Sequence, residues 1–270
     1  MEETILSDQL ILLTNDDGIG APGLMAVTEE LDGLAQLEVY APDRNWSAAG
    51  RTMTLHKPLR VTEVRLLDGT IGHTTSGAPS DCVSLALLGL LDHRPDIVVS
   101  GINAGLNVGE DITYSGTVGA AMEGVRGGIP AIAVSLQVDT ETPVNADYSL
   151  AARFTAKLVQ FILNSALLFP GVLLNVNIPS LPAGRPTKVK MTRLGEHAYN
   201  NYLVKGEDPR GRNYYWITGE PVDESVSENE GTDIWAIANG YISITPIHLD
   251  MTEHSLVEEL RPWEQRSWFE

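Results

Sequence analysis

Two adjacent carboxylates, Asp16 and Asp17, directly follow a short apolar run at residues 10–13. The run is too short for a helix, so it predicts a buried parallel strand that ends where the polar residues begin. In open α/β sheets the ligand crevice lies at the carboxyl ends of the strands. Neighbouring carboxylates repel each other unless a positive charge lies between them, and a hard divalent cation meets that need. An isolated Asp-Asp-Gly also fits a solvated turn, so further residues must distinguish a cation site from such a turn.

Two further polar loops, at 42–52 and 101–111, each follow a candidate strand. In a doubly wound sheet these loops emerge on the same edge as the acidic pair. Ser47 would add a hydroxyl there, and Asn103 would add an amide carbonyl. An all-oxygen set of this kind favours magnesium, manganese or calcium over structural zinc. We therefore predict a metal site formed by Asp16, Asp17, Ser47 and Asn103.

A turn of small residues precedes a predicted helix at 117–126. Ser115 or Thr117 can cap this helix, and Gly116 leaves the backbone amides open to close approach. A helix start with free N–H groups and the positive end of the helix dipole is suited to bind phosphate. The alternative is that these residues only cap the helix and allow tight packing.

A cation beside an anion-binding helix start predicts the hydrolysis of phosphate esters. The metal would polarise the phosphoryl oxygens and acidify a water that attacks phosphorus. Asp16 or Asp17 could accept the proton of that water. Phosphatases that form an aspartyl-phosphate are an alternative, but they space their two acids one residue apart, whereas these are adjacent. Direct attack by water is therefore the favoured chemistry.

Composition narrows the classes of partner and compartment. The 270 residues are 43% hydrophobic and 20% charged, which is typical of a globular protein, and the formal charge is −18. Such a field repels nucleic-acid polymers but still allows a small phosphate ester beside a cation. With one cysteine, Cys82, no signal peptide and no long apolar run, we expect a cytoplasmic protein without membrane contact. The six histidines lack metal-ligand spacing, although His248 could approach the site from a nearby strand.

The first part of the chain alternates strands and helices, which predicts an α/β fold. We expect three α/β/α layers with a mostly parallel, Rossmann-like sheet. The expected helices are at 21–34, 80–91 (capped by Ser80 or Asp81), 117–126 and 147–163. The expected strands are at 10–13, 37–41, 96–100, 130–135 and 172–178, and residues 59–76 are expected to form strand segments with a turn at 68–69.

The composition of the chain changes near residues 181–186, after which turn residues and short β-like runs become common. We expect residues 1–180 to form the catalytic core. Residues 181–270 would then form a β-rich C-terminal extension that packs on the core within one structural domain. The acidic segment 220–231 is expected to be an exposed loop.

Several segments together resemble the SurE (survival protein E) family, and the resemblance runs in order along nearly the whole chain. The matching segments are Asn-Asp-Asp-Gly at 15–18 with Ala-Pro-Gly at 21–23, Ala-Pro-Asp-Arg-Asn at 41–45 with Ser47, Gly-Ala-Pro-Ser-Asp-Cys-Val at 77–83, Ser-Gly-Ile-Asn-Ala-Gly-Leu-Asn at 100–107, Tyr-Ser-Gly-Thr-Val at 114–118, Asp-Pro-Arg-Gly at 208–211, Gly-Thr-Asp at 231–233 and Gly-Tyr-Ile-Ser-Ile-Thr-Pro at 240–246.

The resemblance implies a metal-dependent 5′-nucleotidase that converts nucleoside monophosphates to nucleoside and phosphate. Some members also accept 3′-nucleotides or short polyphosphate. It implies one Mg²⁺ or Mn²⁺ per subunit, held by the four residues named above, with Asp16, Asp17 and Asn103 as the catalytic set. The implied substrate-binding residues are Asn15, Asn107, Ser115, Gly116 and Thr117. It also implies homodimers or homotetramers with exchanged C-terminal segments. Trp46 departs from the family pattern and could stack on the base.

Two other classes remain as alternatives. A signalling receiver domain also has an acidic pair after its first strand, but it needs a phosphoacceptor Asp where this chain has Ser100 and is about half as long. A non-catalytic nucleotide-binding module would keep the helix start without needing the acidic pair.

Overall fold

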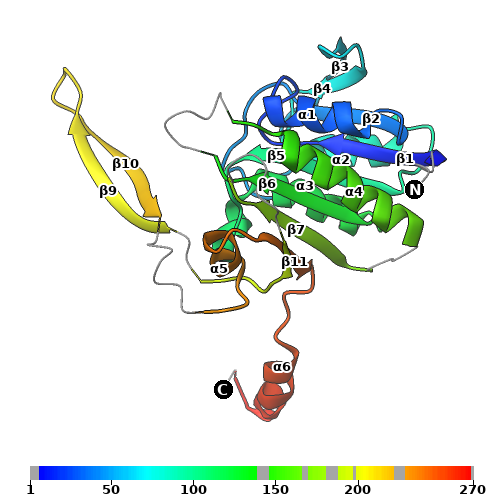
Figure 1. The fold of residues 1–270 in the computed structure, drawn as a ribbon. Helices are drawn as coiled ribbons and strands as arrows, with labels where there is room; N and C mark the ends of the chain where they lie inside the picture. Colours follow the sequence, from blue (N-terminus) through cyan, green and yellow to red (C-terminus); the bar gives the residue numbers. More distant parts are fainter. Residues whose placement is uncertain are drawn as a thin grey trace.

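A nine-stranded sheet forms the centre of the protein in the computed structural model (Figure 1). The structure describes residues 6–138, 146–165, 170–180, 188–196, 199–221 and 229–268. The order of the strands in the sheet is β3-β4-β2-β1-β5-β6-β7-β11-β8. Six neighbouring strands run parallel: β4 (Ile71–Thr75), β2 (Ala35–Pro42), β1 (Leu6–Thr14), β5 (Ile97–Ala104), β6 (Ala131–Leu136) and β7 (Val172–Ile178).

The chain reverses its direction of winding between β1 and β5. From β1 it proceeds to β2 and β4 on one side, with β3 (Val61–Arg65) antiparallel at that edge. It then returns to β5, on the other side of β1, and continues outward through β6 and β7. Because neighbouring loops diverge at such a switch point, a crevice forms at the carboxyl ends of β1 and β5. The prediction of a mostly parallel, Rossmann-like sheet is confirmed.

Helices cover both faces of the sheet, as the three-layer prediction requires. The helices α1 (Pro22–Leu31) and α4 (Ser149–Ser165) lie on one face, and α2 (Pro79–Leu85) and α3 (Gly116–Arg126) lie on the other (Figure 1). Side chains alternate along each strand. Ile11 and Leu13 therefore pack in the core beneath α1 and α4, whereas Leu12 packs in the core beneath α2 and α3.

The helix predicted at 80–91 begins one residue earlier and is interrupted. α2 starts at Pro79, whose fixed φ and missing N–H suit a first helical turn. Ala78 takes the N-cap position, and Ser80 and Asp81 are the second and third helical residues, so both predicted caps are wrong. The Asp81 carboxylate instead accepts the N–H groups of Ala78 at 2.8 Å and Thr54 at 2.9 Å. One π-helical turn (Ala86–Leu90) continues the helix to its end.

Part of the C-terminal region completes the main sheet. β11 (Ile242–His248) pairs antiparallel with β7, and β8 (Val189–Met191) pairs with β11. The helix α5 (Asp233–Ala238) packs beside these strands. The segments 181–187 and 222–228 lie outside the described residues, so the predicted composition boundary and most of the predicted acidic loop are not described.

Two other C-terminal pieces extend away from the body (Figure 1). β9 (Tyr199–Glu207) and β10 (Asn213–Pro221) form a separate antiparallel hairpin. The helix α6 (His254–Leu260), followed by a short 3₁₀ helix (Arg261–Gln265), has no buried residue. No helix among the described residues is both long and apolar enough to span a bilayer.

The antiparallel direction of β11 corrects the expectation for His248. This residue pairs with Val172 at the start of β7. The start of β7 lies at the amino end of the parallel strands, opposite the acidic pair. His248 therefore cannot approach the predicted site.

Candidate metal and phosphate site

Asn15 forms the turn that presents the two acids. Its side-chain amide donates to the carbonyl of Gly18 at 2.9 Å and accepts the Gly18 N–H at 3.2 Å. Gly18 has a φ of +103°, which side chains of L residues rarely allow. Both ends of the buried Asn15 amide are thus engaged within the loop. Asn15 therefore shapes the turn, and the substrate contact predicted for it stays a prediction.

Asp16 packs against the start of α3. Its Oδ1 accepts the hydroxyl of Thr117 at 2.5 Å, and only 3% of the residue is exposed. A Cβ added to Gly116 would lie 2.8 Å from the Asp16 Cβ, so the approach requires glycine. Burial, with a smaller contribution from the charge of Asp17, raises the pKa of Asp16 to about 6, although the Thr117 bond lowers it. The first strand and the predicted phosphate-binding helix therefore meet at Asp16.

Asp17 joins the other two loops. Its Oδ1 accepts the side-chain N–H of Asn45 at 3.1 Å, and its Oδ2 accepts the backbone N–H of Ala104 at 3.0 Å. The oxygen of the Asn45 amide in turn accepts the N–H and the hydroxyl of Ser47, both at 2.6 Å. Because the Ser47 hydroxyl donates its proton to Asn45, the lone pairs of its oxygen remain available for a cation. Burial also raises the pKa of Asp17.

Asn103 lies in β5, and not in a loop after it, so the predicted end of that strand at residue 100 is wrong. The register shifts after Ser100, yet pairing with β6 resumes, with Asn103 opposite Ser135. At the shift, a Cβ on Gly101 would lie 2.4 Å from the carbonyl of Val134, so glycine lets the strands stay close. The Asn103 amide donates to the carbonyl of Gly105 at 2.8 Å, which fixes the orientation of the amide whose oxygen is the remaining predicted ligand atom.

Asn107 is fixed at the ends of β6 and β7. Its backbone N–H donates to Asn177, and its carbonyl accepts from Asn175 and Asn177, all at 2.8 Å. Its side chain donates to Ser135 at 2.7 Å. Sequence reasoning missed these supporting residues, as it missed the bridging role of Asn45. The available signal was two asparagines at alternate positions in an otherwise apolar strand, where burial demands partners.

The start of α3 is compatible with both interpretations of its sequence, helix capping and phosphate binding. Ser115 is the cap, because its hydroxyl accepts the N–H of Val118 at 3.1 Å. Thr117 does not cap but binds Asp16. Gly116 keeps the surface beside Asp16 free of side-chain atoms. Capping and phosphate binding are thus compatible, since only one of the first N–H groups of the helix is used by the cap.

The donor set fits a hard divalent cation. Among the described residues, no Lys, Arg or His forms an ion pair with Asp16 or Asp17, so their charges lack a protein counter-ion. The described part of the chain also has no group of three or more His, Cys, Asp and Glu suited to a metal. A cation here would need the hydroxyl of Ser47 and the amide oxygen of Asn103 besides the two carboxylates, which are the oxygen ligands that Mg²⁺ and Mn²⁺ accept.

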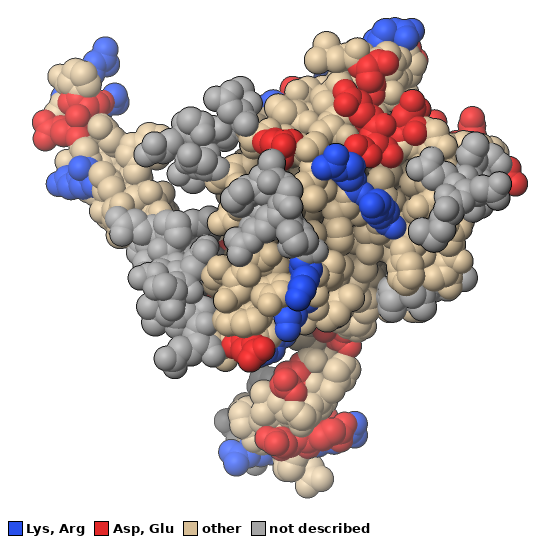
Figure 2. Space-filling model, in the orientation of Figure 1, with Lys and Arg blue, Asp and Glu red and all other residues tan. Residues whose placement is uncertain are grey.

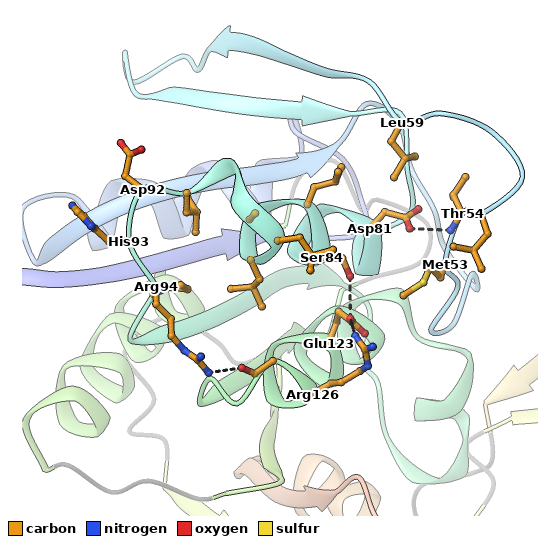
Figure 3. Close-up of a pocket in the computed structure, with 18 residues that line it drawn as sticks. Met53, Thr54, Leu59, Asp81, Ser84, Asp92, His93, Arg94, Glu123 and Arg126 are labelled. Carbon is orange, nitrogen blue, oxygen red and sulfur yellow. Dashed lines mark hydrogen bonds and ion pairs between the residues drawn. The ribbon is translucent and has the colours of Figure 1, made fainter.

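A groove of about 590 Å³ lies elsewhere, between α2, α3 and the chain at 53–59 (Figure 3). Neither Asp16 nor Asp17 lines this groove. At its base Glu123 accepts bonds from Ser84 at 3.0 Å, Arg126 at 2.7 Å and Arg51 at 3.1 Å. Because Arg51 belongs to the same loop as Ser47, the groove is connected to the predicted site through that loop.

These features define a class: a doubly wound α/β protein with oxygen ligands suited to a cation beside a helix N-terminus at the switch point. The model of the family Survival protein SurE matches residues 11–201. The chain belongs to this family.

Similar proteins extend the match over more than nine-tenths of the chain. The chain is 49% identical to the 5′-nucleotidase SurE of Herpetosiphon aurantiacus, with 93% of this chain and 96% of that protein covered. It is 48% identical to the 5′-nucleotidase SurE of Chloroflexus aggregans, over 94% and 98%. The crystal structure of the SurE protein from Aquifex aeolicus superposes with a TM-score of 0.80 at 40% identity, over 94% of this chain and 99% of that one.

Proposed function

We propose that this chain is a divalent-metal-dependent 5′-nucleotidase, which hydrolyses nucleoside 5′-monophosphates to nucleoside and phosphate. One observation carries the proposal: the Asp16 carboxylate is bonded to Thr117, so the acidic pair lies directly beside the N–H groups of a helix start. The names of the similar proteins support the same activity. The activity on 3′-nucleotides and short polyphosphate that the family resemblance implies is part of the proposal.

One Mg²⁺ or Mn²⁺ per subunit is the proposed cofactor. Asp16, Asp17, Ser47 and Asn103 would hold it. When bound, such a cation polarises phosphoryl oxygens and acidifies a coordinated water. The geometry of Asn45 and Thr117 supports this assignment, because these residues orient three of the ligands in the way outer hydrogen-bond partners do at metal sites.

The protein's own groups would bind the phosphate and manage the proton. The first N–H groups of α3 and the dipole of the helix favour an anion next to Gly116 and Thr117. Asn107 is held rigidly at the same edge of the sheet and would add a polar contact. Asp16 or Asp17 would accept the proton of the attacking water, because both carboxylates belong to the proposed metal site.

The test is phosphate release from a panel of nucleoside 5′- and 3′-monophosphates and short polyphosphate, with Mn²⁺, with Mg²⁺ and with a chelator. The proposal expects release from 5′-monophosphates that the chelator abolishes and Mn²⁺ restores. Nucleotide binding of equal affinity with and without metal, and no release, would instead identify a non-catalytic binding module.

We also propose a homodimer or homotetramer with exchanged C-terminal segments. Two-stranded hairpins are marginally stable alone, yet the β9–β10 hairpin exposes apolar side chains on both faces. Tyr202, Val204 and Trp216 share one face, whereas Leu203 and Ile217 share the other. Contacts with a second copy would cover these faces. In this proposal residues 1–180 form the catalytic core, and residues 181–270 form the extension that supports it.

The net charge supports a small-molecule substrate, and we propose a cytoplasmic location. In Figure 2 acidic side chains gather over α1 and the neighbouring strands, and basic side chains lie separately over α4. With a formal charge of −18, we expect no binding to nucleic-acid polymers or anionic membranes. Cys82 is buried against Thr75, and burial raises its pKa to about 12, so its thiol is unreactive in a reducing compartment.

A further inference from the structure

The C-terminal region contacts the predicted active-site loop through a buried carboxylate that is separate from the metal set. Asp233, the first residue of α5, is fully buried. Its Oδ2 accepts the N–H of Gly109 at 2.8 Å. Its Oδ1 accepts the N–H groups of Gly195 at 2.7 Å and Ile234 at 2.9 Å. One carboxylate therefore ties together three segments that are far apart in the sequence.

Gly109 lies on the segment that joins Asn107 to the start of α3. Its φ is +59°, and a Cβ there would lie 2.0 Å from the carbonyl of Glu196. The next N–H, of Glu110, donates to the same carbonyl at 3.3 Å. The segment is thus pressed against the C-terminal region at Gly109, while Asn107 is bonded to the ends of β6 and β7. Its course toward the helix start depends on both attachments.

α5 does not need Asp233 for its own cap. Thr232 is the cap, because its hydroxyl accepts the N–H of Trp235 at 3.2 Å and donates to the carbonyl of Asn229 at 2.9 Å. Of the three bonds to Asp233, only the one from Ile234 is local. The bonds from Gly109 and Gly195 are tertiary, and bonds from N–H groups to a carboxylate are among the stronger hydrogen bonds in proteins.

We propose that Asp233 is a positioning residue for phosphate hydrolysis: through the N–H of Gly109 it sets the segment that presents Asn107 and the phosphate-binding start of α3. The inference rests on the proposed function and deepens it. In this proposal the C-terminal region contributes to catalysis by positioning the segment that leads to α3. A displacement of about 1 Å in the groups that hold a substrate can lower turnover about 10²-fold.

Asp233→Asn is the test variant, with Thr232→Ala as its matched control. Asparagine has one acceptor oxygen, so its NH₂ group must face the N–H of Gly109 or Gly195. We expect kcat/KM for a 5′-monophosphate to fall about 10²-fold, mostly in kcat, with a weaker inhibition by inorganic phosphate. The affinity for Mn²⁺, measured by calorimetry, should not change, because no metal ligand contacts Asp233. Thr232→Ala weakens α5 itself and should leave kcat and KM unchanged.

Hydrogen exchange gives a readout that does not depend on activity. In Asp233→Asn, exchange should rise in the peptide that covers residues 105–114, and in Thr232→Ala it should rise only around α5. Should Asp233→Asn not fold, Gly109→Ala perturbs the same contact from the other side and should give the same loss of kcat. Wild-type kcat with faster exchange at 105–114 would overturn the inference, as would an equal loss of kcat in Thr232→Ala. A wild-type protein that releases no phosphate would overturn the proposed function instead, and the exchange result would still report on the Gly109 contact.

Discussion

Replacing Asp16 by asparagine should stabilise the metal-free protein while removing metal binding. Burial, with a smaller contribution from the charge of Asp17, raises the pKa of Asp16 from 3.8 to about 6. Each pKa unit corresponds to about 1.4 kcal/mol, so ionised Asp16 destabilises the metal-free fold by about 3 kcal/mol at neutral pH. A neutral amide removes this penalty. If the carboxylate served only the structure, its replacement by asparagine would instead lower the stability of the metal-free protein.

The Thr117 hydrogen bond does not reduce this gain, because the weaker bond to a neutral acceptor is already contained in the net pKa shift of Asp16. The amide oxygen of the introduced asparagine would still accept the Thr117 hydroxyl. We therefore expect a net stabilisation of about 3 kcal/mol, or a rise in Tm of about 6–12 °C. The gain should be complete above the folded pKa of about 6 and should vanish as the pH falls toward 3.8, where Asp16 is protonated in both states.

The assay is thermal and urea unfolding of both proteins in chelator and in Mn²⁺. At a Mn²⁺ concentration of about 1,000 times Kd, the wild type should gain about 4 kcal/mol, and Asp16→Asn should gain nothing. The order of stability of the two proteins should therefore reverse between the two conditions. Asp81→Asn is the control, because the buried Asp81 carboxylate accepts two backbone N–H groups and has no proposed metal role. It should lose about 1–3 kcal/mol in both conditions.

Two results would refute this reasoning. If Asp16→Asn lost stability in chelator as Asp81→Asn does, the carboxylate would be structural. If Mn²⁺ left the wild type unchanged, the oxygen set would not bind the cation.

Three further predictions concern metal binding and assembly. The Mn²⁺ affinity should fall about tenfold for each pH unit below about 6, because a proton competes for Asp16, whose pKa burial has raised; calorimetry at several pH values would contradict this if affinity stayed constant. Asn45→Ala should weaken Mn²⁺ binding about 10- to 100-fold, because it removes the common partner of two proposed metal ligands, whereas Asn239→Ala, remote from the site, should not. Trp216→Asp in the hairpin should reduce the oligomer size measured by light scattering, and an unchanged size would count against a hairpin interface. Leu67→Asp, on an exposed turn of the core, is its control.

The sheet and the acidic pair could be predicted because the signals are local. An apolar run that ends in Asn15 and two acids marks the end of a strand whatever its neighbours are. Repetition of strand and helix then fixes parallel crossovers, so loops after successive strands share one edge. Ser47 and Asn103 could be assigned to that edge for the same reason, before any contact was known.

Errors in prediction arose where a long-range contact overrides local preference. Gly101 suggested a strand end, but its missing Cβ lets β5 stay paired with β6 to Ala104. Asp81 is a good cap former, yet Pro79 begins the helix and the carboxylate bonds to Thr54, 27 residues away. His248 looked close to the site, but the direction of β11 is set by pairing with β7.

The sequence by itself determined which residue types line the carboxyl edge of the sheet and what chemistry they can perform. Only the tertiary structure decided which atoms meet: Asp16 with Thr117, Asp17 with Asn45 and Ala104, and Asp233 with Gly109. The physical reason is sequence separation. Strand and helix patterns depend on neighbours within a few positions, whereas these bonds join residues 28 to 124 positions apart and form only when packing of the whole sheet brings their loops together.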